Sequence, residues 1–218
     1  MISQPHPACA SHGPRFIQRA FAWIMHSQDD TMHKVYGERK QRLFDGLRGS
    51  VAEIGPGAGA NFRYYPKNIH LTAFEPNPFM HSYLHDEAKK YNLDLSIHTC
   101  GAEQTPVEDD SIDTVICTLV LCSVDDPPAV VSEAKRILKP GGRFLFIEHV
   151  AAQPGTFRRT VQNVIRPAWN IIGDGCCPNR ETWSVLQGAG FSECQIEHFI
   201  GEIPIPFIKP HIAGVAVK

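Results

Sequence analysis

Short β-branched runs alternate with helical patterns from residue 50 onward, and this alternation constrains the fold more than any other feature of the chain. The runs predict strands over 50–55, 70–75, 95–100, 112–118 and 143–150. Between them, helical spacing predicts a short helix from Ala60 and longer helices over 77–91 and 127–138. Strands that alternate with helices form a parallel sheet covered on both faces. The sequence therefore predicts an α/β fold built on a mostly parallel sheet.

The end of the chain follows a different pattern. A helical stretch over about 156–172 and a helix over 180–187 precede two strand-like segments, 193–200 and 211–218. The link between these segments, "GEIPIPFIKP", is rich in proline and is too irregular to supply the helix that a parallel crossover needs. We therefore expect a terminal antiparallel hairpin on the sheet.

The first 49 residues carry two helical patterns of their own. Apolar residues recur at helical spacing over 15–25, and a second helix is expected over 38–47. A chain of 218 residues fits one domain with a cap. We predict an N-terminal helical cap over 1–49 and a main domain over 50–218, with an inserted segment over 155–178.

Composition and charge exclude several classes of protein. Lys and Arg number 21 against 23 Asp and Glu, and no basic run is long enough to follow a nucleic-acid backbone. The seven cysteines form no repeated CxxC pairs, which favours reduced thiols in a cytoplasmic compartment. The apolar stretch Phe16 to Met25 is interrupted by polar residues and is shorter than the roughly 20 residues of a membrane span. It could lie on a membrane surface, but we do not expect membrane contact.

The octapeptide "AEIGPGAG", residues 52–59, is a candidate ligand-binding loop. Gly55, Gly57 and Ala60 fit a dinucleotide fingerprint, with Glu75 about 20 residues further on to bind a ribose. Glu53 argues for a different nucleotide, because a carboxylate beside the loop would repel a pyrophosphate and attract an ammonium or sulfonium group. S-adenosylmethionine carries both cations and no phosphate. The octapeptide alone also fits an ordinary turn beside a solvated acid.

Further stretches share their order with a known family. They are "AFEPN", "GAEQTPVEDDSIDTVICTLVLCSV" and "AKRILKPGGRFLFIEH". With the glycine loop, they closely resemble the class I S-adenosylmethionine-dependent methyltransferases over about residues 50–150. The resemblance implies a Rossmann-like sheet of seven strands and S-adenosyl-L-methionine as the cofactor.

The same resemblance implies a set of donor-binding residues. Those lining the methionine part would be Glu53, Gly55, Gly57 and Gly59. Glu75 would hold the ribose hydroxyls, with Pro76 and Asn77 continuing the same loop. Ala102 and Glu103 together would flank the adenine. Thr118 and Leu119 would lie under the methyl group, although Leu119 is also compatible with a core position.

A narrower resemblance extends outside this region. "FAWIMHSQDDTMHKVYGERKQRLF", "TLVLCSVDDP", "EHVA", "RPAWNIIGDGCCPNRETWSVLQGAGFSE" and "PHIAGVAVK" are similar to animal methyltransferase-like proteins that methylate alkyl thiols and hydrogen sulfide, and to their microbial relatives. The chain differs from the animal proteins in having no long hydrophobic anchor, and in Pro56 and Glu75. The resemblance implies a small thiol acceptor, such as methanethiol, or sulfide.

Three residues are candidates for acceptor chemistry. His149, at the carboxyl end of a strand, and Asp174, in "GDGCC", could act as a base on a thiol; each could instead be structural, as a loop histidine and a turn former. Cys176 is a candidate for lining the acceptor pocket, or is a buried inert thiol. We predict no metal site, because the adjacent Cys176 and Cys177 have no further Cys or His at ligand spacing.

Two other functions stay open at this point. Similar sheets methylate quinones, phenols and lipid-like acceptors, and fold alone does not fix the substrate. The chain could also bind the nucleotide without catalysis and act through a partner. A nicotinamide oxidoreductase is a third and weaker alternative, based on the glycine spacing alone.

Overall fold

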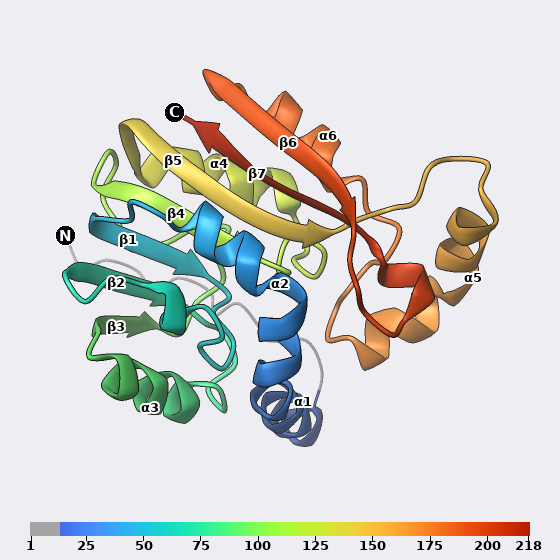
Figure 1. The fold of residues 1–218 in the computed structure, drawn as a ribbon, viewed down its shortest axis with the longest axis horizontal. Coiled ribbons are helices and arrows are strands. Elements are labelled where there is room, and N and C mark those ends of the chain that lie inside the picture. The colour runs from blue at the N-terminus through green and yellow to red at the C-terminus, as the bar shows by residue number, and fades with distance from the viewer. Residues whose placement is uncertain (1–13) are drawn as a thin grey trace, which may run out of the picture.

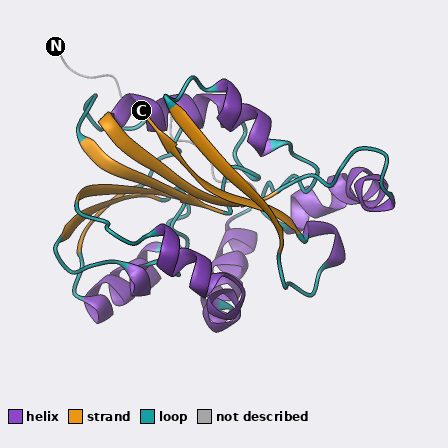
Figure 2. Cartoon of the chain, turned by 45° about the horizontal axis from the view of Figure 1, so that its top comes forward, coloured by secondary structure: helices purple, strands orange, loops and turns teal. Residues whose placement is uncertain are grey.

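The computed structural model describes residues 14–218 and contains one seven-stranded sheet with helices on both faces (Figures 1 and 2). The strands are β1 (Gly49–Ile54), β2 (Ile69–Phe74), β3 (Asp94–His98), β4 (Ile112–Thr118), β5 (Leu138–His149), β6 (Glu193–Ile200) and β7 (Pro210–Val217). The helices are α1 (Arg15–Ser27), α2 (Asp29–Leu43), α3 (His81–Tyr91), α4 (Pro127–Ile137), α5 (Phe157–Ile172) and α6 (Thr182–Gly188), with short 3-10 turns at Phe62–Tyr64 and Pro206–Ile208.

The strand order confirms the predicted fold class. The sheet runs β3-β2-β1-β4-β5-β7-β6, and the pairs from β3 to β5 are all parallel. β7 lies antiparallel between β5 and β6, which is the expected terminal hairpin. The order reverses between β1 and β4, so the loops that follow these strands separate at the edge where open α/β sheets bind ligands.

Alternate residues of the central strands face two separate cores, as a parallel sheet covered on both faces requires. In β1, Ala52 and Ile54 belong to the core beneath α4 and α6, whereas Val51 packs on the opposite side with residues of α3. In β5, Phe144 and Leu145 divide in the same way. Figure 2 shows the two layers of helices.

Three boundaries differ from the prediction for local reasons. α2 begins at Asp29 rather than at 38, directly after α1. α3 begins at His81 rather than at 77, because the Asn77 side chain accepts a hydrogen bond from the Phe79 N–H and holds that segment in a turn. β5 begins at Leu138 rather than at 143, with a register shift against β4 that accommodates the glycines of the "KPGG" segment.

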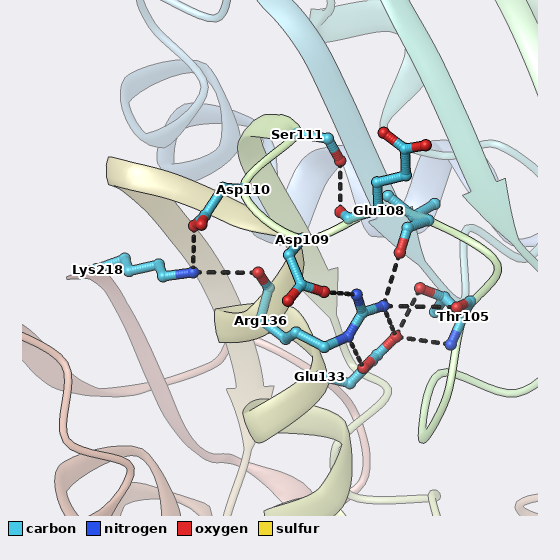
Figure 3. A network of polar contacts seen from close by, with 9 residues as sticks. Thr105, Glu108, Asp109, Asp110, Ser111, Glu133, Arg136 and Lys218 are labelled. Atoms are coloured by element: carbon cyan, nitrogen blue, oxygen red, sulfur yellow. Dashed lines mark hydrogen bonds and ion pairs between the residues drawn. The ribbon is translucent and has the colours of Figure 1, made fainter.

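A polar network fastens the loop after β3 to α4 (Figure 3). Arg136 donates hydrogen bonds to Glu133 and to the Val107 carbonyl, and it pairs with Asp109. Glu133 Oε1 in turn accepts from the Thr105 N–H and hydroxyl, each at 2.7 Å. Burial would raise the pKa of Glu133, but the hydrogen bonds from Arg136 and Thr105 outweigh it and lower the pKa. The network therefore holds the loop that carries Ala102 and Glu103.

No helix within residues 14–218 combines the length and the apolar character that a membrane crossing demands.

Candidate functional site

A cavity of about 220 Å³ opens at the carboxyl ends of β1, β2 and β4. Loops after these strands and after β3 supply most of its wall, and α1 and α2 lie beside the same edge of the sheet (Figure 1). Of the predicted donor-binding residues, the wall contains Gly55, Gly57, Glu75, Pro76, Asn77, Ala102, Glu103, Thr118 and Leu119. The structure thus brings together residues from four separate loops.

The glycine loop needs glycine for two different reasons. Gly55 and Gly57 have φ of +59° and +57°, a region that side chains disfavour. A Cβ on Gly55 would lie 2.6 Å from Val120 Cγ2, whereas a Cβ on Gly57 would meet nothing within 4 Å. Gly57 therefore leaves room on the cavity side, as close approach of a ligand requires. Gly59, with φ of +89°, instead packs toward Glu87 and does not line the cavity.

Glu75 follows β2 directly and organises the loop beside the glycines. Its Oε2 accepts a hydrogen bond from the Gly57 N–H at 3.1 Å, and its Oε1 accepts from the Asn77 N–H at 2.8 Å. Burial raises the pKa of Glu75 to about 7, although these two hydrogen bonds act in the opposite direction. A carboxylate with remaining lone pairs at a cavity wall is well suited to bind ribose hydroxyls.

Asn77 connects this loop to the N-terminal helices. Its side-chain N–H donates to the Gln18 carbonyl at 3.1 Å, so the second loop and α1 are held together. From the same helix, Phe21 and Met25 line the cavity, and Met32 and Lys40 of α2 join them. The sequence analysis did not single out Lys40, because its place in a stretch of α2 does not show that its side chain reaches the cavity.

Glu53 occupies a different position from the one the glycine loop alone indicated. Its side chain is 1% exposed and is not part of the cavity wall. It accepts hydrogen bonds from Asn61 Nδ2 at 2.7 Å and from the Tyr65 hydroxyl at 2.9 Å. Burial raises its pKa to about 7 against the effect of both partners. Asn61 also donates to Thr118 Oγ1 and lines the cavity, so Glu53 acts on the site through Asn61.

The ionisable groups in the cavity wall are mostly acidic. Within the described part of the chain they are four acids, Glu75, Glu103, Asp125 and Asp174, and one base, Lys40. Such a lining attracts a cation and disfavours a diphosphate. The electrostatic expectation based on Glu53 therefore has a basis in other residues of the same site.

The three acceptor candidates lie at different depths. Asp174 lines the cavity from the turn after α5, with a left-handed φ of 47°. His149 and Cys176 are 6% and 7% exposed and lie behind the wall, where His149 Nε2 is 3.0 Å from Cys176 Sγ. Trp169 Nε1 donates to the same sulfur at 3.0 Å.

Cys122 completes this buried group. A hydrogen bond from Cys176 and then the charge of His149 lower the pKa of Cys122, whereas the pKa of Cys176 is raised. Burial lowers the pKa of His149, but the Cys122 thiolate outweighs it and raises that pKa. The sequence analysis did not single out Cys122, because no Cys or His at a short interval along the chain indicates that it meets His149 and Cys176.

Glu148, next to His149, was also missed and shapes the wall from behind. It is fully buried, and its Oε1 accepts hydrogen bonds from the N–H groups of Val120 and Leu121, each at 3.0 Å. Burial raises its pKa to about 8. The carboxylate holds the loop after β4, in which Leu119 adopts a φ of +60° and lines the cavity. Leu119 is thus a wall residue and not only a core residue.

Comparisons with known proteins agree with this geometry. Residues 52–146 match the family model described as a methyltransferase domain. The chain is 37% identical to human thiol S-methyltransferase TMT1A, over 96% of this chain and 87% of that protein, and 35% identical to human thiol S-methyltransferase TMT1B, over 97% and 88%. Among solved structures, a Thermotoga maritima protein described as a SAM-dependent methyltransferase and possible histamine N-methyltransferase aligns with a TM-score of 0.66, at 21% identity, over 94% of this chain and all of that one.

Proposed function

Because the chain belongs to the S-adenosylmethionine-dependent methyltransferases, in the family of the thiol S-methyltransferases, we propose that it methylates a small thiol or hydrogen sulfide. One observation carries the choice of acceptor. The generic methyltransferase model covers residues 52–146, but the similarity to the human thiol enzymes extends over 96% of the chain. It therefore includes nearly all of α1, α2 and the 155–178 segment, which supply the parts of the site outside the donor loops.

The residues of the cavity fit the donor. Gly57 leaves its cavity side open, Glu75 offers carboxylate oxygens for the ribose, and the acidic wall favours a cationic amino-acid end. When bound, S-adenosylmethionine supplies an electrophilic methyl group on a sulfonium, which a thiolate displaces in line without a covalent enzyme intermediate. We assign donor binding to Gly55, Gly57, Glu75, Pro76, Asn77, Ala102, Glu103, Thr118 and Leu119, with Glu53 and Gly59 supporting the glycine loop from outside the cavity.

The residues on the acceptor side of the wall would exclude water and accept the proton of the thiol. Phe21, Met25 and Leu119 keep the cavity apolar and exclude water, which favours a reaction in which an anion and a cation neutralise each other. Asp174, which lines the same cavity, would orient the thiol and receive its proton. His149 and Cys176 would act on the acceptor only indirectly, from behind the wall.

The proposal also places the protein in the cytoplasm. The six cysteines within residues 14–218 are free, which supports a reducing environment such as the cytoplasm.

Turnover with a panel of acceptors tests the substrate class. Purified protein is incubated with S-adenosylmethionine and with sulfide, methanethiol, 2-mercaptoethanol, a phenol or a quinol, and S-adenosylhomocysteine and the methylated product are measured by mass spectrometry. We expect methyl thioethers from the thiols and methanethiol from sulfide. Product from the phenol or quinol alone would replace the thiol proposal with a carbon or oxygen acceptor. Donor binding without any product would favour a catalytically inactive binding protein.

A further inference from the structure

Three metal-ligand side chains meet behind the cavity, and the proposed reaction uses none of them directly. Cys122 comes from the loop after β4, His149 from the end of β5 and Cys176 from the turn after α5. One ligand atom from each lies within 4.8 Å of the other two. All three residues are buried, at 2%, 6% and 7% exposure.

The backbone holds these residues in place. The Cys177 N–H donates to the Cys122 carbonyl at 2.8 Å, which joins the turn after α5 to the loop after β4. His149 lies in the β5–β7 ladder opposite His211. The Trp169 indole N–H donates a hydrogen bond to Cys176 Sγ, which would orient and stabilise this sulfur as a metal-bound thiolate. The group is therefore arranged before any ligand binds.

The chemistry of the group matches a borderline-soft divalent ion. Two thiolates and one imidazole are zinc ligands, and tetrahedral bonds of ordinary length would place the ligand atoms about 3.5 to 3.8 Å apart. His149 Nε2 and Cys176 Sγ are 3.0 Å apart, so a shift of about half an ångström would admit the ion. Two thiolates would neutralise its charge, which makes burial feasible.

The second ring nitrogen of His149 lacks a hydrogen-bond partner in the described part of the chain. His149 Nδ1 is buried and has no hydrogen-bond partner among residues 14–218. Because His149 Nε2 faces Cys176 Sγ and would be the ligand atom, Nδ1 is left to donate to a water that orients the ring, as the second nitrogen of a metal-bound histidine does.

We propose that Cys122, His149 and Cys176 bind a zinc-class divalent metal ion. Only these three ligands meet in the described part of the chain, so the fourth position belongs to an exogenous ligand, the arrangement of open rather than closed zinc sites. Binding releases the protons of those thiols that are still protonated. The ion would connect three segments of the cavity wall and fix the turn that carries Asp174.

Cobalt substitution tests this directly, because Co²⁺ bound to thiolates gives charge-transfer absorption in the near ultraviolet. Tag-free protein is stripped of metal under reducing conditions and titrated with Co²⁺, and then with competing Zn²⁺. The variants are Cys122→Ser, Cys176→Ser and His149→Gln. Cys177→Ser is the matched control, since this adjacent buried cysteine lies outside the group. Circular dichroism and binding of S-adenosylhomocysteine verify folding.

We expect about one Co²⁺ per chain, displaced by Zn²⁺, with charge-transfer intensity reduced by about half in each Cys→Ser variant and unchanged in Cys177→Ser. If a variant fails to fold, thermal unfolding of the unmodified chain still decides, because bound Zn²⁺ must raise the midpoint. No charge-transfer band in the unmodified protein would overturn the proposal. Equal bands in Cys122→Ser, or a reducible Cys122–Cys176 disulfide in the purified protein, would also overturn it. None of these measurements requires a methyl acceptor.

Discussion

Replacement of Glu75 by Gln tests the most specific polar contact assigned to the donor. The substitution keeps the shape of the side chain and removes its charge. In the free protein, both carboxylate oxygens accept backbone hydrogen bonds, from Gly57 and Asn77. A glutamine can satisfy only one of the two N–H groups through its carbonyl oxygen, and its NH₂ must face the other. The loop therefore loses one contact before any ligand arrives.

The size of the effect follows from the contact that is lost. A hydrogen bond to a charged group contributes about 1.5 to 3 kcal/mol, so the dissociation constant of S-adenosylhomocysteine should rise about 10- to 150-fold. Because burial places the pKa of Glu75 at about 7, the affinity of the unmodified protein should also weaken as pH falls from 8 to 6. In the variant, this part of the pH dependence should disappear.

Isothermal titration calorimetry with S-adenosylhomocysteine at several pH values measures both quantities. Glu202→Gln removes the same charge from an exposed position outside the cavity and serves as the control. Equal affinities for the unmodified protein and Glu75→Gln at pH 8 would refute the ribose assignment. An unchanged pH profile in the variant would show that another group titrates.

Four further outcomes follow from the same geometry. Gly57→Ala should raise the dissociation constant of the donor by at least about tenfold, because the new methyl group carries the strain of a left-handed φ and enters open space beside the cavity; calorimetry measures this. Asp174→Asn keeps a residue type that tolerates a φ of 47°, so it should reduce kcat more than donor affinity in steady-state kinetics. Arg136→Ala should lower the free energy of unfolding in urea by about 1–3 kcal/mol, through loss of its hydrogen bonds to Glu133. The temperature midpoint of unfolding of the free protein, measured by circular dichroism, should decrease as the pH is raised from about 5 to about 8. Burial raises the pKa of Glu148 to about 8, so the folded state keeps a proton that the unfolded state has already released, and this stabilisation is lost as the pH rises.

That Gly55 and Glu75 would meet in one cavity wall was predictable, because both directly follow neighbouring strands. Ile54 pairs with Phe74 in the register of β1 and β2, so the residues that follow, Gly55 and Glu75, emerge side by side. Parallel strands make this outcome independent of the remaining tertiary structure. The terminal hairpin was predictable for a similar reason, since its proline-rich link cannot form a crossover helix.

The position of Glu53 required the sheet itself. Successive side chains of a strand face opposite sides, and Ile54 faces the core under α4. Glu53 therefore faces the other side, where Tyr65 and Asn61 cover it. The sequence of the glycine loop does not show which face of the sheet Glu53 occupies. The sequence analysis therefore predicted a cationic ligand from Glu53, whereas the acids in the cavity wall are other residues.

The group behind the wall was not predictable from spacing at all. His149 lies 27 residues after Cys122 and 27 residues before Cys176, far outside the short intervals by which zinc ligands are found in a sequence. Lys40 is a related case, because it reaches the cavity from a helix that sequence alone does not place against the sheet. Both depend on how loops and helices meet in three dimensions.

The acids of the cavity wall affect both the stability of the free protein and the charge of the ligand that the cavity would bind. The raised pKa of Glu75 means that its ionised form is disfavoured in the free fold, so its contribution to stability is complete at low pH and is lost as pH rises through about 7. Among residues 14–218, Lys40 is the only base in a wall that holds four acids. A ligand with an ammonium and a sulfonium group supplies the missing positive charge and favours the ionised carboxylate, whereas a diphosphate would increase the repulsion. In the proposed donor site, the same residues that are unfavourably ionised at pH 8 would therefore favour a cationic nucleotide.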